Sequence, residues 1–215
     1  RLHTKLTKGQ ARALAIELLA KVGIPKPERL VDEYPFRLSG GMRQRAMIAM
    51  ALACNPNMLI ADEPTTALDV TIQAQVLDLI RRLRDEHQMA VMLITHNMGI
   101  VAEMADVVTV MYAGTTVEEA PTVDLFEAPL HPYTRGLVAS IPVMGQRKER
   151  LDVIPGNVPN LIDMPPGCRF APRCKARIEF GLTKCEVEEP GMIEAKPNHL
   201  VRCWLYEGKD DDINR

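Results

Sequence analysis

The sequence is poor in aromatic residues, in net charge and in long apolar runs. Aromatic side chains make up 4% of the 215 residues, and 26 basic residues nearly balance 28 acidic ones, giving a formal charge of −2. This balance gives no sign of a nucleic-acid-binding protein. No apolar stretch approaches the ~20 residues that span a bilayer. The polar start, RLHTKLTKGQ, predicts no signal peptide. If the protein acts at a membrane, we expect it to bind at the membrane surface.

The first 140 residues alternate between amphipathic segments and short apolar ones. The spacing of apolar residues predicts helices over 11–22, from Ser39 to about Cys54, over 71–87, and a short one ending at Met104. Strands are predicted at 57–61, 90–95, 107–112 and 115–118. Buried strands alternating with helices indicate a parallel α/β sheet. Ligands of such sheets gather at the carboxyl ends of the strands.

Beyond about residue 140 the periodicity fades and prolines become frequent. Four of the five cysteines also lie in this region, whereas Cys54 lies on the predicted helix after Ser39 and is expected to be an inert core thiol. We therefore predict two domains, 1–140 and 141–215. The second is a small, loop-rich extension that depends on something other than a large apolar core.

A glycine-rich helix start is the first candidate site. In LSGGM at 38–42, the backbone N–H groups of Gly40 and Gly41 and the hydroxyl of Ser39 lie at a predicted helix N-terminus. Unpaired amides and the helix dipole both favour an anion such as phosphate there. A Ser-Gly pair before a helix is also an ordinary cap and turn, so this motif alone decides nothing.

Acidic residues and a histidine follow the predicted strands. Asp62 and Glu63 end the strand in NMLIADEP, which suits Asp62 to hold Mg²⁺ and Glu63 to orient an attacking water. Asp69 precedes the helix at 71–87, and His96 follows the next strand directly. Each has a plain alternative: a solvated acidic turn for the pair, an N-cap for Asp69, and a satisfied polar side chain for His96.

Taken together in this order, these elements resemble an ABC-type ATPase over roughly residues 8–140. LSGGMRQR resembles the signature motif, LIADE the Walker B run, ALD the D-loop, and ITHN the switch histidine. The resemblance implies a partial P-loop NTPase core with a helical signature subdomain. It also implies ATP held between two subunits, identical or paralogous, in a head-to-tail dimer.

The family pattern assigns a role to each motif residue. Ser39, Gly40 and Gly41 would contact the γ-phosphate held by the partner subunit, and Asp69 would reach across the interface. Asp62 would hold Mg²⁺, Glu63 would be the general base, and His96 would bridge the γ-phosphate and the attacking water.

Two departures from the family pattern stand out. Asn97 follows the switch histidine where the family usually has an acid, which puts a helix-capping contact in doubt. No GxxxxGK[ST] sequence is present, and neither are the upstream adenine-stacking aromatic and glutamine loop. Without that loop little cradles the β- and γ-phosphates. Because the chain begins with Arg1 rather than Met, we expect truncation rather than natural loss of the loop.

The C-terminal region resembles the extension of peptide-importer ATPases, the oligopeptide and dipeptide permease family. The resemblance rests on HPYTRGL at 131–137, IPGNVPNL at 154–161 and PPGCRFAPRC at 165–174. It implies an ATPase subunit on the cytoplasmic face of the membrane, with transmembrane permease subunits and, indirectly, a peptide-binding protein as partners. The alternatives are a soluble ABC ATPase of the repair or translation type and a non-catalytic regulatory fragment.

The four C-terminal cysteines are candidate metal ligands. Cys168, Cys174, Cys185 and Cys203 are separated by five, ten and seventeen residues, without the short C-x₂₋₄-C knuckle of structural zinc. A [4Fe–4S] site tolerates irregular spacing, and cytoplasmic chemistry disfavours disulfides. Some members of the peptide-importer family carry such a cluster, so we expect [4Fe–4S] here, with Zn²⁺ or no metal as alternatives.

Overall fold

The computed structural model describes residues 5–141, 154–164 and 166–207. Their contacts divide the chain into two compact units between His96 and Asn97. The boundary predicted at 140/141 falls inside the second unit, where strands from both sides of it pair. In the described residues no helix is both long enough and apolar enough to cross a membrane.

The first unit begins with a helical part. It contains α1 (Lys8–Lys21), α2 (Pro27–Leu30), the 3₁₀ turn η1 (Pro35–Arg37) and α3 (Gly40–Leu52), and α1 contacts both α2 and α3. Thr7 and Gln10 form a capping box at the start of α1. Gly23 has φ 76°, the left-handed conformation that ends a helix, as its position in the sequence predicts.

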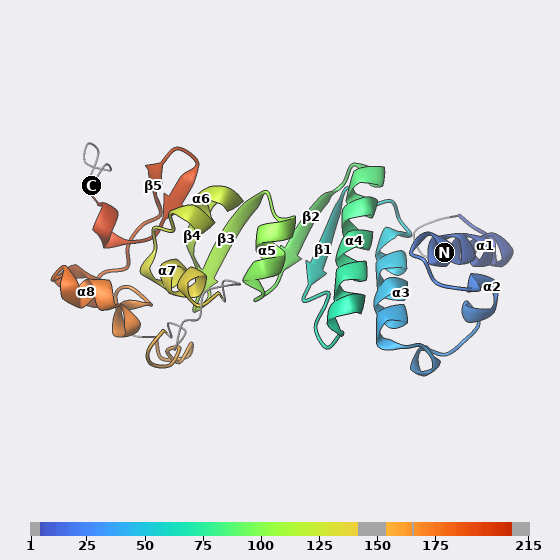
Figure 1. Cartoon of the computed structure of the whole chain (residues 1–215), viewed down its shortest axis with the longest axis horizontal. Coiled ribbons are helices and arrows are strands. Elements are labelled where there is room, and N and C mark those ends of the chain that lie inside the picture. The colour runs from blue at the N-terminus through green and yellow to red at the C-terminus, as the bar shows by residue number, and fades with distance from the viewer. Residues whose placement is uncertain (1–4, 142–153, 165, 208–215) are drawn as a thin grey trace. The chain divides into compact units, whose positions relative to one another are not determined.

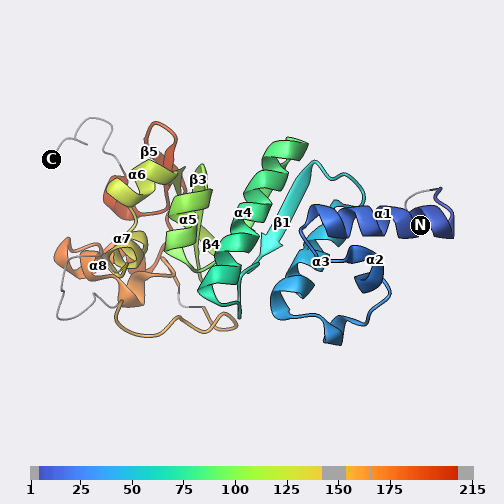
Figure 2. The ribbon, with the colours of Figure 1, turned by 45° about the vertical axis from the view of Figure 1, so that its right-hand side comes forward.

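A parallel strand pair and one long helix complete this unit. Strand β1 (Met58–Asp62) pairs in parallel with β2 (Ala90–Ile94), and α4 (Val70–His87) connects them. Figures 1 and 2 show α4 alongside the pair. The apolar stripe on α4, which consists of Val76, Leu79, Ile80 and Leu83, is buried. The α/β fold class and the parallel pairing of these two strands are as predicted.

Strand β1 is buried on one face only and β2 is half-buried on that face, which corrects the prediction of fully buried strands. Leu59 and Ala61 point into the unit, whereas four apolar side chains share the opposite face and are 45 to 61% exposed: Met58, Ile60, Met92 and Ile94. A parallel pair normally has both faces covered. The described residues therefore cover only one of the two apolar faces of the β1–β2 pair.

The second unit contains an antiparallel sheet, not a continuation of the parallel one. Its strands are β3 (Val107–Tyr112), β4 (Thr115–Pro121), β5 (Ile193–Lys196) and β6 (His199–Val201), in the order β3-β4-β6-β5. The prediction that the third and fourth strands join the parallel sheet is therefore wrong. Ala113 and Gly114 have φ 46° and 79°, the two-residue hairpin turn that forces β3 and β4 to run antiparallel.

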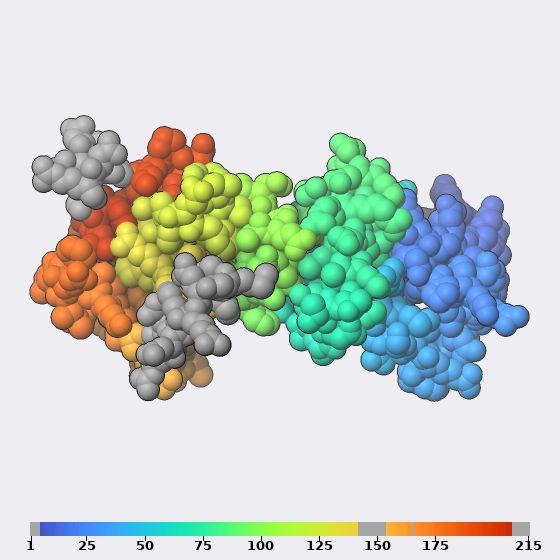
Figure 3. Space-filling view, viewed as in Figure 1, coloured from blue at the N-terminus to red at the C-terminus, as the bar shows by residue number. Residues whose placement is uncertain are grey.

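Helices and loops cover this sheet. They are α5 (Met98–Met104), α6 (Thr122–Glu127), α7 (Pro132–Ala139), α8 (Lys175–Glu179), and the 3₁₀ turns η2 (Ala171–Arg173), η3 (Thr183–Glu186) and η4 (Trp204–Tyr206). The core contains Val108, Val110, Tyr112, Val117, Leu125 and Phe170. Figure 3 shows the α8 region (orange) at the surface of this unit, and Ile178 and Phe180 are exposed there.

A fully buried carboxylate, that of Glu118, connects the C-terminal strands to residues 130–131, where the HPY segment (131–133) begins. Glu118 on β4 is 0% exposed and His199 on β6 is 1% exposed. Oε1 of Glu118 accepts from the amide of Leu130 (2.7 Å) and is paired with Nε2 of His199 (2.7 Å), and Oε2 accepts from the amide of His131 (2.9 Å). His131 in turn caps α7 by accepting from the amide of Tyr133. One side chain thus joins three segments.

Candidate functional site

The glycine-rich segment starts α3 as predicted. Ser39 is the N-cap, and its hydroxyl accepts a hydrogen bond from the amide of Met42 (3.3 Å). A Cβ on Gly41 would lie 2.7 Å from Cγ2 of Ile72, so only glycine fits without movement of that side chain. The start of α3 therefore packs closely on the start of α4. Ser39 and Gly40 remain exposed to solvent.

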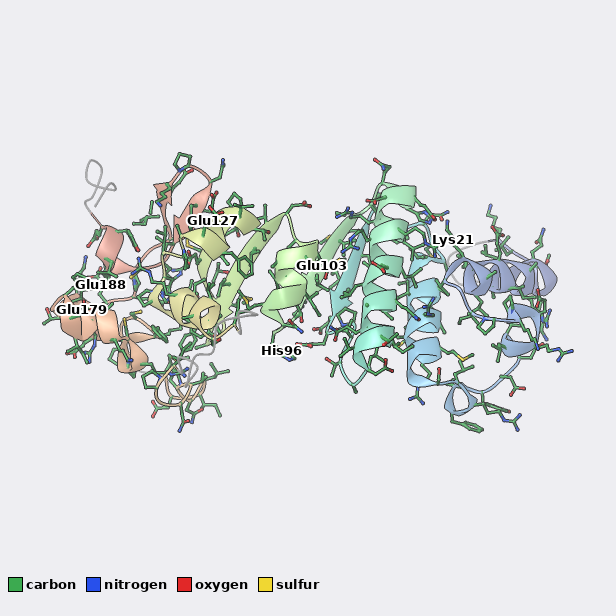
Figure 4. All side chains as sticks on the ribbon, viewed as in Figure 1. Lys21, His96, Glu103, Glu127, Glu179 and Glu188 are labelled. Atoms are coloured by element: carbon green, nitrogen blue, oxygen red, sulfur yellow. The ribbon has the colours of Figure 1, made fainter. Side chains whose placement is uncertain are left out.

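Glu63 and His96 meet beyond the carboxyl ends of the two parallel strands. Nδ1 of His96 lies 2.7 Å from Oε1 of Glu63, and the hydroxyl of Thr66 donates to Oε2 (2.8 Å). The amide of Glu63 donates to the carbonyl of Ile94, which ties the two strand ends together. Figure 4 labels His96 at the end of β2, and its side chain is 83% exposed.

The electrostatics of this pair keep Glu63 ionised. The hydrogen bond from His96, and then the one from Thr66, lower the pKa of the Glu63 carboxyl group. Glu63 also has φ 46°, an uncommon conformation for a residue with a side chain. A carboxylate accepts only, so the His96 Nδ1–H is the donor, which leaves Nε2 facing outward. The arrangement can polarise a water molecule and contact an anion beside it.

Asp62 and Asp69 lie close to Glu63 in sequence but differ in their surroundings. Asp62 is the exposed last residue of β1, opposite Ile94 of β2. Asp69 is the N-cap of α4, where its carboxylate accepts from the amide of Ile72 (2.9 Å). The capping role of Asp69 is thus present in the structure. Its reach across a subunit interface and magnesium binding by Asp62 stay predictions.

Two smaller expectations are corrected. Asn97 does cap a helix, since its Oδ1 accepts from the amides of Gly99 (3.0 Å) and Ile100 (3.4 Å) at the start of α5. An amide oxygen serves this purpose as well as a carboxylate. Cys54 is exposed and is not a core thiol, because α3 ends at Leu52 and leaves it in the following turn.

The comparisons with known proteins agree with these motifs. Residues 2–66 match the ABC transporter family, and residues 117–179 match the oligopeptide/dipeptide transporter C-terminal region. The oligopeptide transport ATP-binding protein AppD of Bacillus subtilis (strain 168) is 53% identical over 205 residues, 95% of this chain and 61% of AppD. Protein BMEII0863 of Brucella melitensis biotype 1 is 50% identical over 213 residues, 96% of this chain and 62% of that protein.

The chain is similar to ABC transporter ATP-binding proteins over almost all of its length. Residues 117–179 add the similarity to the C-terminal region of the oligopeptide/dipeptide transporters. It spans about three fifths of the length of the curated relatives it matches. A solved dimeric structure of the ATP-binding cassette MJ0796, bound to ADP and Pi, is similar over 55% of this chain and 50% of that chain, with 28% identity and a TM-score of 0.48.

The second candidate site is the group of C-terminal cysteines. The amide of Cys168 donates to the carbonyl of Cys185 (2.9 Å). In each of the six pairings of Cys168, Cys174, Cys185 and Cys203, ionisation of one thiol would raise the pKa of the other, so the four thiols lie near one another. Four separate segments thus bring their thiols into one neighbourhood. Yet no three His, Cys, Asp or Glu groups among the described residues are arranged closely enough to hold a metal ion as they stand.

Burial makes these thiols reluctant to ionise. It raises the pKa of Cys168 and Cys174, and, together with the neighbouring thiols, raises that of Cys185 to about 11 and that of Cys203 to about 12. Four thiolates of like charge repel one another in such a place. A bound cation would remove this obstacle by taking the place of the protons. The donor set is therefore suited to a thiophilic metal group and unsuited to free thiolates.

Sequence reasoning missed several residues that support these sites. Thr66 lies three residues after Glu63 and donates a hydrogen bond to its carboxylate. This contact could not be predicted without knowing that Glu63 adopts a left-handed backbone conformation. Glu118 had no clear signal, because β4 reads TTVEEAP and a second acid follows it directly. Its partner His199 had none, since the two lie 81 residues apart.

Proposed function

We propose that this chain is the larger part of an ATP-hydrolysing subunit that powers import of oligopeptides or dipeptides across the cytoplasmic membrane. The observation that carries the proposal is the Glu63–His96 pair at the strand ends, held by Thr66. In this role Glu63 is the general base, Asp62 holds Mg²⁺, and His96 bridges the γ-phosphate and the attacking water. Ser39, Gly40 and Gly41 contact the ATP of a second subunit, and Asp69 couples the two sites.

The substrate and the partners follow from the relatives. AppD is named an oligopeptide transport ATP-binding protein, and the C-terminal match covers the HPY segment and two of the four cysteines. This match supports peptide import over a repair or translation ATPase. The partners are then a second ATPase subunit, transmembrane permease subunits and, through them, a peptide-binding protein. The subunit works at the cytoplasmic face of the membrane.

The test of the ATPase uses this chain joined to a segment that carries GxxxxGK[ST]. Glu63→Gln should keep ATP binding and reduce hydrolysis by about 10²–10⁴-fold, the range for a lost general base. Glu17→Gln, which removes an exposed carboxylate from α1, is the matched control and should hydrolyse ATP normally. Hydrolysis by Glu63→Gln at the unsubstituted rate would show that Glu63 is not the base. ATP-driven uptake of labelled peptides into vesicles, with permease subunits present, tests the substrate.

We further propose that Cys168, Cys174, Cys185 and Cys203 hold a [4Fe–4S] cluster. The gathering of the four thiols supports it, and thiolate is the ligand such clusters use. The cluster would cross-link four loop segments and supply a centre able to carry one electron. Anaerobically purified protein should be brown and contain about four irons per chain, the number in a [4Fe–4S] cluster. Colourless protein with one zinc would instead indicate a structural zinc site.

A further inference from the structure

One buried donor near the cysteines has no partner. Arg177 lies on α8, and its Nε is buried without a hydrogen bond. Among the described residues only one other side-chain atom, Oγ1 of Thr134, shares this condition. Native proteins pair nearly all buried polar groups, so an unpaired guanidinium N–H calls for a ligand that these protein atoms do not supply.

The position of Arg177 identifies the kind of acceptor. Helix α8 starts directly after Cys174, and the guanidinium is ion-paired through Nη1 with Glu186, the residue that follows Cys185. Its positive charge opposes the effect of burial on the pKa of both Cys174 and Cys185. Arg177 therefore lies between two segments that each carry one cysteine of the proposed site.

The other arginines nearby are committed to the fold. Arg169 donates to the carbonyl of Ala113 in the β3–β4 turn (2.7 Å). Arg173 donates to the carbonyl of Pro155 (2.8 Å) and lies over the ring of Tyr112. These contacts fasten the cysteine region to the sheet. Arg177, by contrast, has its Nε–H unpaired and buried, while its Nη1 pairs with Glu186.

We propose that the Nε–H of Arg177 donates a hydrogen bond to the sulfur of Cys174 or Cys185 when that sulfur is a metal-bound thiolate. This inference rests on the proposed iron–sulfur cluster and adds a positioning residue to it. Hydrogen bonds to cysteine sulfur and nearby positive charge stabilise the more negative, reduced state of such a site. Arg177 should therefore raise the reduction potential, while the cysteines alone hold the iron.

The experiment compares variants of the whole chain, purified anaerobically, by iron content and by redox titration followed in visible absorption. Arg177→Gln should retain about four irons. At a fixed potential its ratio of reduced to oxidised cluster should fall about tenfold, a shift of about −59 mV for a one-electron couple. Lys175→Gln is the matched control, since it removes the same charge from an exposed position on the same helix. Its potential should stay unchanged.

A second variant guards against loss of the cluster in the first. Glu186→Gln removes the carboxylate that partly neutralises Arg177, so its potential should rise. If Arg177→Gln does not retain iron, an unchanged or lower potential in Glu186→Gln overturns the inference. Four irons with equal potentials in the unsubstituted protein and Arg177→Gln remove the role of Arg177 and leave the cluster intact. Zinc or no metal in the unsubstituted protein refutes the cluster itself, and the role of Arg177 with it.

Discussion

Replacing Glu118 by Ala should destabilise the second unit more than any surface change. Glu118 is 0% exposed, and both of its oxygens accept from backbone amides. Each buried donor left without a partner costs about 1–3 kcal/mol, so the two amides of Leu130 and His131 together cost about 2–6 kcal/mol. His199 loses its partner as well. Since a domain is typically stable by only about 5–15 kcal/mol, this one substitution removes a large share.

The assay is urea unfolding followed by tryptophan fluorescence. Trp204 is the only tryptophan in the sequence and lies in η4 of the second unit, so its signal reports on that unit alone. With a slope of about 2 kcal/mol per molar urea, a loss of about 4 kcal/mol lowers the midpoint by about 2 M. Glu118→Gln keeps one acceptor oxygen and should lose about half as much.

The next residue provides the matched control. Glu119 lies on the same strand but faces outward, and its carboxylate accepts from the hydroxyl of Thr109 at the surface. Glu119→Ala should therefore change the free energy of unfolding by no more than about 0.5 kcal/mol. If the midpoints of Glu118→Ala and Glu119→Ala fell together, the buried carboxylate would not be what joins these segments.

Three further outcomes are expected. Gly41→Ala should destabilise the first unit by about 1–3 kcal/mol, because its Cβ would lie 2.7 Å from Ile72, and Ile72→Ala should restore most of the loss in thermal unfolding followed by circular dichroism. His96→Ala should raise the pKa of the Glu63 carboxyl, measured by NMR, because it removes the hydrogen bond from His96, which lowers this pKa most. Burial lowers the pKa of His131 to about 3 from 6.5. The neutral native form then loses stability as the pH falls from about 6.5 to about 3, by about 1.4 kcal/mol per pH unit, in urea midpoints read from tryptophan fluorescence.

Each of these has its own control. Gly40→Ala places its Cβ 3.5 Å from the nearest side chain and should be tolerated; equal destabilisation at both glycines would rule out the clash with the neighbouring helix. Thr66→Val should raise the pKa of Glu63 less than His96→Ala does. A larger rise in Thr66→Val would show that the hydrogen bond from Thr66, not the one from His96, lowers this pKa most. His131→Asn replaces the capping Nδ1 by a side-chain oxygen that can also accept from the amide of Tyr133, and it should flatten the pH dependence. An unchanged slope would place the titration elsewhere.

The local features of the first unit followed from the sequence, while the long-range features of the second did not. The stripe on α4 and the cap at Ser39 depend on neighbours a few positions away, so spacing alone predicts them. Strands β5 and β6 have four and three residues, too few to show a period. Their place beside β4 depends on the buried pairing of Glu118 with His199, which no local pattern contains.

The candidate sites divide in the same way. That Glu63 and His96 would lie near each other followed from the rule that ligands gather at the carboxyl ends of parallel strands. The cysteines could be recognised as a set, but their spacing did not indicate that Arg177 on α8 pairs with Glu186, the residue after Cys185. The antiparallel direction of β4 was not predicted, because it depends on two consecutive positive φ values at Ala113 and Gly114, which no residue type guarantees.

The uncovered face of the β1–β2 pair can make the measured stability of the first unit depend on protein concentration. Met58, Ile60, Met92 and Ile94 lie side by side in solvent, and in the described residues each strand has a single neighbour, so one backbone edge of each is unpaired. Exposed apolar side chains beside an unpaired strand edge favour association between copies. By mass action, association stabilises the first unit as the protein concentration rises. An unfolding midpoint for that unit therefore characterises the single chain only when it is unchanged by dilution.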